Sequence, residues 1–201
     1  MEDDYSNERI HEDDGKYTIA GCLAIASGAL LLPYTILSIA VDVNHSTVPV
    51  LMPIIVLIAI VQMTFSIFAF IQFRNLLNER YGFHDIDNLV PVIVIGGILI
   101  TFISILGKSY HVLRIPALVL LIIFAIPVSI AGIMYGIRLL RLKAKLHGLL
   151  RPLAYTHIIG NIFFLTLILG FLGLLTIAAF DIMLGIMFLQ GREEDDAVDF
   201  V

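Results

Sequence analysis

The stretch VPVLMPIIVLIAIVQMTFSIFAFIQF, residues 48–73, contains no acidic or basic side chain. A helix needs about 20 mostly apolar residues to cross the roughly 30 Å hydrocarbon core of a bilayer. Lipid offers the backbone no hydrogen-bond partners, so a run of this length and composition must be helical there. We therefore expect residues 48–73 to form a transmembrane helix.

Similar apolar runs occur along the rest of the chain, which has 201 residues. Only 14% of the residues are charged and 59% are hydrophobic, whereas about a quarter of an ordinary soluble domain is charged. The sequence therefore predicts an all-α fold, a polytopic transmembrane bundle of about five spans. The expected spans are residues 17–41, 48–73, 89–106, 115–140 and 159–182.

The last apolar stretch, residues 152–190, is the hardest to divide. As one helix it would be about 58 Å long, too long for a simple crossing. As two crossing helices with a turn it would be too short. We expect one span at 159–182 with an interfacial segment at one or both ends. Whether the stretch is broken stays open, and a break that returned the chain would reverse the predicted side of the C-terminus.

Basic residues gather after the fourth predicted span, where the loop contains Arg141, Lys143, Lys145 and Arg151, with Arg138 in the helical turn before it. Lysine and arginine in short loops mark the cytoplasmic side of a membrane. The N-terminus is then cytoplasmic, and five spans of a cell-membrane protein would place the C-terminus outside. These five side chains could also bind anionic lipid headgroups, or they could only fix the orientation.

Acidic residues gather at both ends of the chain, in residues 1–16 and 191–201. High charge with few apolar residues is typical of disordered, solvated tails. Asn44 begins an Asn-His-Ser sequence that matches a glycosylation site, in a loop predicted to lie outside. Three-residue matches occur often by chance, so glycosylation of Asn44 stays open.

Small residues recur at four-residue spacing in two predicted spans. Ala20, Ala24 and Gly28 lie along the first span, and Gly132 and Gly136 lie along the fourth. Such ridges allow helix backbones to approach closely in a membrane. We expect them to pack inside the bundle, with the first and fourth spans as neighbours. A dimer interface is the alternative.

Four polar side chains fall within the apolar segments: Gln62, His157, Asn161 and Asp181. Polar groups inside a membrane cost free energy and therefore often mark a functional site. They could line the aqueous path of a transporter. Alternatively, Gln62 and Asn161 form hydrogen bonds between helices, while His157 and Asp181 lie at opposite interfaces. On the predicted spans, no acidic residue lies at the centre of a helix, which argues against ion-coupled transport.

The sequence contains no recognisable catalytic, metal-binding or cofactor-binding motif. It lacks H-E-x-x-H and has a single cysteine, Cys22, and its histidines fall mostly in tails and loops, where they cannot form a bis-histidine haem site. We therefore expect no catalytic residue, metal, cofactor or nucleic-acid partner. The preferred interpretation is a non-enzymatic multi-pass membrane protein. It would be an accessory protein, with a membrane protein partner or a second copy, or a small transport-related protein. The alternative is a membrane-embedded enzyme or a redox protein with haem or quinone.

Overall fold

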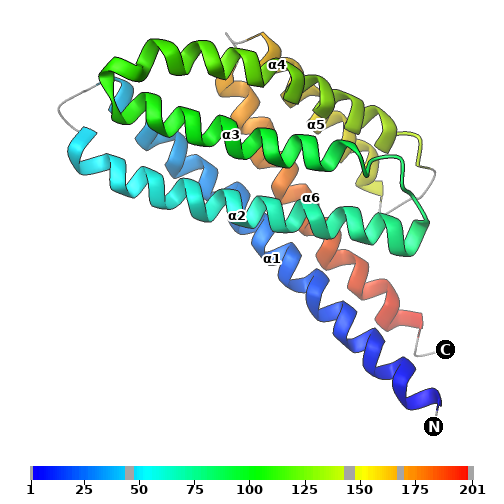
Figure 1. Ribbon diagram of the computed structural model, residues 1–201. Coiled ribbons are helices and arrows are strands. Elements are labelled where there is room, and N and C mark those ends of the chain that lie inside the picture. The colour runs from blue at the N-terminus through cyan, green and yellow to red at the C-terminus, as the bar shows by residue number, and fades with distance from the viewer. Residues whose placement is uncertain (1, 44–47, 143–147, 167–169, 199–201) are drawn as a thin grey trace.

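The computed structural model describes residues 2–43, 48–142, 148–166 and 170–198. In these ranges the chain is helical, which confirms the predicted all-α fold (Figure 1). The elements are α1 (Glu2–Val43), α2 (Val48–Tyr81), α3 (Leu89–Ser109), the short 3₁₀ helix η2 (His111–Leu113), α4 (Arg114–Leu139), α5 (Leu150–Leu165) and α6 (Gly170–Val198).

Five helices of the described ranges are long and apolar enough to cross a membrane, as predicted. The candidate spans are Gly15–Val41, Val50–Tyr81, Leu89–Ser109, Arg114–Leu139 and Leu172–Gln190. Large apolar side chains remain exposed along the outer faces of these helices, for example Leu57 at 63%, Phe102 at 58% and Ile123 at 56%. Such faces suit contact with lipid, because lipid does not penalise exposed apolar surface.

The predicted fifth span, 159–182, is wrong. The chain turns inside that range, because α5 ends at Leu165 and α6 begins at Gly170. Glycine is a poor helix former, and a Cβ on Gly173 would lie 2.9 Å from the Phe164 ring, so this glycine lets the two helices pack closely beyond the turn. Hydropathy alone conceals the turn, since both sides of it are apolar.

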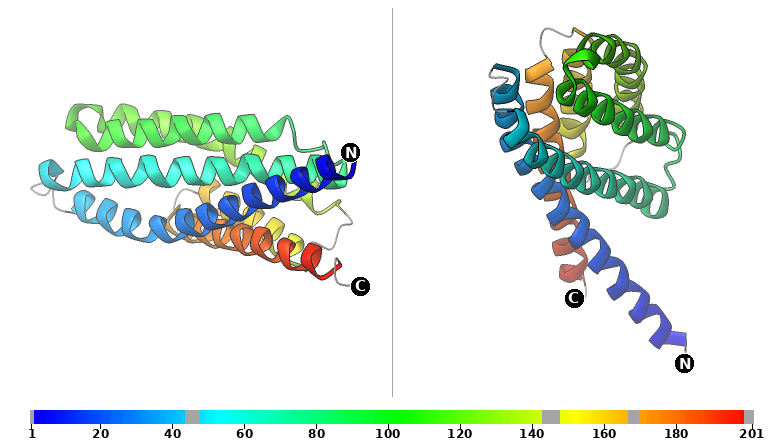
Figure 2. Two further views of the ribbon diagram at one scale, coloured as in Figure 1. Left: turned by 90° about the horizontal axis from the view of Figure 1, so that it is seen from below. Right: turned by 60° about the vertical axis from the view of Figure 1, so that its left-hand side comes forward.

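The expectation that the two ends of the chain lie on opposite sides of the membrane is also wrong, while the side that faces the cytoplasm stays a prediction. α5 runs antiparallel to both α4 and α6, which returns the chain to the end of the bundle where it began. Tyr17 of α1 stacks on Phe188 of α6 with ring centroids 5.9 Å apart, while Gly28 lies against Ala178. The N-terminal end of α1 and the C-terminal end of α6 therefore lie at the same end of the bundle (Figures 1 and 2).

The two acidic ends are helical where the structure describes them, in place of the predicted disordered tails. α1 begins at Glu2, and α6 continues to Val198. Forming the first turn is the costly step of helix formation, and extending an existing helix adds one hydrogen bond per residue. The span inside each helix therefore provides the nucleus from which the acidic end extends.

The small-residue ridges pack inside the bundle, but the predicted pairing of the first and fourth spans is wrong. α1 packs on α6, while α4 packs on α5. A Cβ on Gly28 would lie 2.7 Å from the Ala178 carbonyl oxygen, and one on Gly136 would lie 2.5 Å from Ile158. Ala20 and Ala24 are fully buried. The unpredicted turn explains the error, because it makes α6 a separate helix, and α6 covers the small-residue ridge of α1.

Candidate functional site

Asp181 lies at the middle of the last membrane-spanning segment, nine residues after Leu172 and nine before Gln190. Only 3% of its surface is exposed. The prediction that Asp181 lies at an interface is therefore wrong, as is the expectation that no acidic residue lies at the centre of a span. Both errors follow from the misplaced fifth span, since Asp181 was assigned to the end of a helix that does not exist.

Side chains from two other helices, α1 and α2, hold this carboxyl group. The Ser27 hydroxyl of α1 donates a hydrogen bond to Asp181 Oδ2 at 2.7 Å, and the Ser66 hydroxyl of α2 donates to Oδ1 at 3.4 Å. Gln62 Nε2 donates to Ser27 Oγ at 3.2 Å, so Gln62 reaches the carboxyl group through the serine. Ser27, Gln62, Ser66 and Asp181 together are called the Asp181 site below.

All the hydrogen-bond partners of Asp181 in the described residues are neutral hydroxyl groups. A charged side chain at the centre of a bilayer costs about 2.5–3.5 kcal/mol on insertion scales, and such residues are usually paired or functional. A hydroxyl group can both donate and accept a hydrogen bond. Ser27 and Ser66 can therefore accommodate Asp181 either with or without a proton on its carboxyl group.

Ser27 and Ser66 were not identified from the sequence, although each carried a weak signal. Ser66 follows Gln62 by four residues, which places both on one helical face. Ser27 lies directly before Gly28 in the small-residue ridge, a part of α1 that approaches α6 closely. Neither signal could be interpreted without knowing that Asp181 lies at the same depth.

A second group of polar atoms lies beside the Asp181 site. The His157 ring of α5 packs between aromatic rings of the other helices, with centroids 4.7 Å from Phe180 and 5.0 Å from Tyr135. His157 Nε2 and the Tyr135 hydroxyl are buried, and neither has a hydrogen-bond partner in the part of the chain that the structure describes. His157 therefore lies inside the bundle beside Phe180, the neighbour of Asp181, and the expectation that His157 and Asp181 lie at opposite interfaces is wrong.

Asn161 does not link two helices, contrary to one of the two expectations for it. Its Nδ2 donates a 2.8 Å hydrogen bond to the His157 carbonyl oxygen one turn earlier in α5. Its carboxamide lies against Gly132 of α4, where a Cβ would come within 2.4 Å of Oδ1. Gly132 thus makes room for a polar side chain, and Asn161 supports the helix that carries His157.

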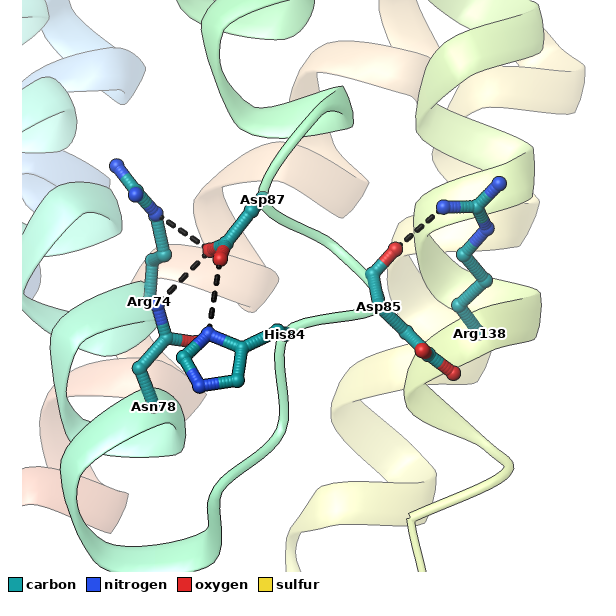
Figure 3. A network of polar contacts seen from close by, with 6 residues as sticks. All are labelled: Arg74, Asn78, His84, Asp85, Asp87 and Arg138. Atoms are coloured by element: carbon teal, nitrogen blue, oxygen red, sulfur yellow. Dashed lines mark hydrogen bonds and ion pairs between the residues drawn. The ribbon is translucent and has the colours of Figure 1, made fainter.

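The end of the bundle that holds both chain ends carries a third polar group, in the loop between α2 and α3 (Figure 3). Asp87 pairs with Arg74 Nε at 2.7 Å and accepts a hydrogen bond from Asn78 Nδ2 at 2.9 Å. His84 Nδ1 lies 3.0 Å from its other oxygen. Burial opposes ionisation of Asp87, but the hydrogen bonds from Asn78, Arg74 and His84 and the charge of Arg74 lower its pKa to about 2.

Three of the predicted lipid-binding residues, Arg138, Arg141 and Arg151, lie at this same end. Arg138 donates a hydrogen bond to the Asp85 carbonyl oxygen, so it holds the α2–α3 loop against α4 (Figure 3). Arg141 and Arg151 are exposed. Lys143 and Lys145 lie outside the described residues, as does Asn44. Binding of anionic headgroups by these basic residues stays a prediction.

Comparisons with protein-family models, with curated proteins and with solved structures find no match for this chain. The accessory, transport and redox interpretations must therefore be weighed on the chemistry of the polar sites. Among the described residues, no group of three or more histidine, cysteine, aspartate or glutamate side chains is placed to hold a metal ion.

Proposed function

We propose that this multi-pass membrane protein is a transport protein in which Asp181 binds and releases a proton during the transport cycle. The observation that carries the proposal is the position of Asp181, which is buried at the middle of α6 and held by neutral side chains. Acidic residues inside membrane spans usually mark proton or ion pathways.

A proton suits this geometry better than a metal ion does. Calcium takes six to eight oxygen ligands and magnesium requires a near-ideal octahedron. Asp181 supplies a single carboxyl group, and the Ser27 hydroxyl already contacts it at 2.7 Å. A cation would have to displace this hydrogen bond, whereas a proton can be added to the carboxyl group with both serines in place.

The proton would act on the contacts between helices. Ser27, Ser66 and Asp181 lie on α1, α2 and α6, so a change of charge on Asp181 changes how strongly three helices are held together. A carboxylate strengthens hydrogen bonds from its donors, but it also favours entry of water into a membrane interior. This coupling between protonation and helix packing is what a proton-driven transporter requires.

The proposal can be tested with purified protein in liposomes that carry an internal pH-sensitive dye. An imposed pH gradient should drive proton entry, and infrared spectroscopy at a series of pH values should detect the carbonyl stretch of the protonated Asp181. Asp181→Asn should abolish both signals. Asp85→Asn is the matched control, because Asp85 is exposed in the α2–α3 loop (Figure 3), outside the membrane-spanning segments, whereas Asp181 lies at the middle of one.

Ser27→Ala should shift the pH dependence of the carbonyl signal, since it removes the shorter hydrogen bond to Asp181. Proton flux that is identical in Asp181→Asn and in the wild type, with no carbonyl signal that depends on Asp181, would overturn the proposal. The Asp181 site would then only link helices, which is the accessory role.

A further inference from the structure

The buried polar atoms of His157 and Tyr135 have no role in the proton binding described so far. Both atoms, His157 Nε2 and the Tyr135 hydroxyl oxygen, lie inside the bundle without a hydrogen-bond partner in the described ranges. Buried polar groups of native proteins are almost always hydrogen-bonded, so two unpartnered groups on rings in contact need an explanation. A mobile proton and the water that carries it would partner both.

We infer that His157, assisted by Tyr135, passes protons between Asp181 and the end of the bundle that carries the basic loops. This inference rests on the proposed function, because it concerns the route by which protons reach Asp181. Imidazole accepts and donates protons near neutral pH, which makes histidine a common proton carrier.

The helix register places Tyr135 near the end of the bundle that carries the basic loops, called the basic end below, and His157 beside Asp181. α5 begins at Leu150, at the basic end. His157 follows Leu150 by seven residues, or about 10 Å along the helix. Tyr135 precedes the end of α4 by one turn. Asp181 lies nine residues inside its span, about 13 Å from Gln190. Thr156 contacts Met183, and Gly160 lies against Thr176, across the antiparallel α5 and α6. His157 is therefore level with Asp181. The route from the basic end reaches Asp181 sideways, through Tyr135 of α4 and His157 of α5.

The two sites are also neighbours across the bundle. Phe180, which packs on His157, directly precedes Asp181 in α6. Phe70, whose ring centroid lies 6.2 Å from that of His157, follows Ser66 by one turn of α2. Tyr135 on α4 is the titratable side chain whose ring faces His157, and Asn161, one turn along α5, contacts the His157 backbone. A proton carrier at His157 thus has Asp181 as its nearest acidic neighbour on α6.

The transfer consists of two proton exchanges. A hydronium ion at the basic end gives a proton to His157 Nε2, leaving water and an imidazolium. The imidazolium then gives that proton through a water molecule to the Asp181 carboxylate, so the histidine becomes neutral and the carboxyl group is formed. The Tyr135 hydroxyl orients the water by donating a hydrogen bond. No electron is transferred, and each proton lost by one group is gained by the next.

A carrier changes the rate at which Asp181 is protonated, whereas a structural residue changes the final state. The test is a rapid pH jump on the full-length protein in lipid nanodiscs, followed by the carbonyl signal of Asp181. His157→Gln, which keeps a polar side chain, and His157→Phe, which keeps an aromatic ring, should slow this signal about 100-fold, the usual contribution of a positioned acid–base group. The final amplitude should equal that of the wild type.

Tyr135→Phe removes one oxygen atom and keeps the ring contacts, and it should slow the signal by a smaller factor. Thr156→Val is the control on the same helix, because the Thr156 hydroxyl faces Met183 rather than His157. It should protonate at the wild-type rate. Melting curves show whether each variant is folded, and Tyr135→Phe decides the test if both histidine variants unfold.

Wild-type rates in both folded histidine variants, or in Tyr135→Phe when it alone is folded, would overturn the relay while leaving Asp181 as the proton site. The absence of any Asp181 carbonyl signal in the wild type would instead overturn the proposed function. The two failures are therefore distinguishable in a single set of spectra.

Discussion

Asp87 and Asp181 are both held by hydrogen bonds, but their partners differ in charge. Asp87 lies at the basic end of the bundle and contacts Arg74, Asn78 and His84, which lower its pKa to about 2. Asp181 lies at the middle of a span and contacts only hydroxyl groups among the described residues. A carboxyl group with an arginine partner remains charged at physiological pH, so Asp87 is suited to holding a loop in place.

The difference shows how one chain uses one carboxyl group to hold its structure and another to exchange a proton. The ion pair of Asp87 connects the α2–α3 loop to α2, and a proton there would only weaken the fold. Within the described ranges Asp181 has no such fixed partner charge, so the protein can add or remove its proton without breaking an ion pair. Giving Asp181 a basic partner residue should therefore make it behave like Asp87.

The largest expected effect is therefore that of Ser66→Lys. A lysine at this position of α2 would face Asp181 Oδ1, which Ser66 contacts at 3.4 Å, and an opposite charge at that range favours the carboxylate. The infrared carbonyl signal of protonated Asp181 should disappear, and proton flux with it. Ser66→Met is the control for side-chain length and should keep the signal. A lysine variant that still protonates Asp181 would contradict the comparison.

A second prediction concerns the contact that brings Ser27 to Asp181. A Cβ on Gly28 would lie 2.7 Å from the Ala178 carbonyl oxygen and 2.8 Å from Ile182. Gly28→Leu should therefore push α1 away from α6 and lower the stability by about 3 kcal/mol, at the upper end of typical overpacking costs. Thermal melting in detergent measures this change.

Gly97→Leu is the matched control for Gly28→Leu, because a Cβ on Gly97 in α3 would meet no atom within 4 Å. It should melt like the wild type, or slightly higher, since leucine is a better helix former than glycine. Equal melting of the two variants would contradict the close approach of α1 and α6.

The sequence alone was sufficient for the apolar helices, because a run of some 20 apolar residues has one stable form in lipid. Seven of the eight ends of the first four predicted spans agree with the structure to within three residues. The second span is the exception, because it ends at Tyr81, eight residues later than predicted. The last stretch failed because the turn between α5 and α6 joins two apolar helices, and hydropathy does not change across it. The single misplaced turn moved Asp181 from the centre of a span to its end.

The polar sites were predictable only in part, for a related reason. Gln62, His157, Asn161 and Asp181 stand out in apolar segments, and all four lie within or beside the two polar sites. Which of them meet depends on the pairing of helices that are distant in the sequence. Ser27 and Asp181 are separated by 154 positions, and no local pattern indicates that they touch.

The smallest expected effect is that of Asp87→Asn, which tests the other half of the comparison. The pKa of Asp87 is about 2 in the folded protein, below its ordinary value of 3.8. Its charge therefore contributes stability that is fully present above about pH 4 and is lost as the pH falls toward 2. Because its side chain is 26% exposed to solvent, we expect a contribution of about 1–2 kcal/mol.

At neutral pH, Asp87→Asn should melt at a lower temperature than the wild type, because Arg74 loses its partner while Asn78 and His84 lose a charged acceptor. The difference should shrink as the pH falls through the window from about 4 to 2, since wild-type Asp87 is then protonated as well. Asp85→Asn should show no such dependence, because Arg138 binds the backbone carbonyl of Asp85, which the substitution keeps. A difference between Asp87→Asn and the wild type that stays constant over this window would mean that the charge of Asp87 is not what stabilises the loop.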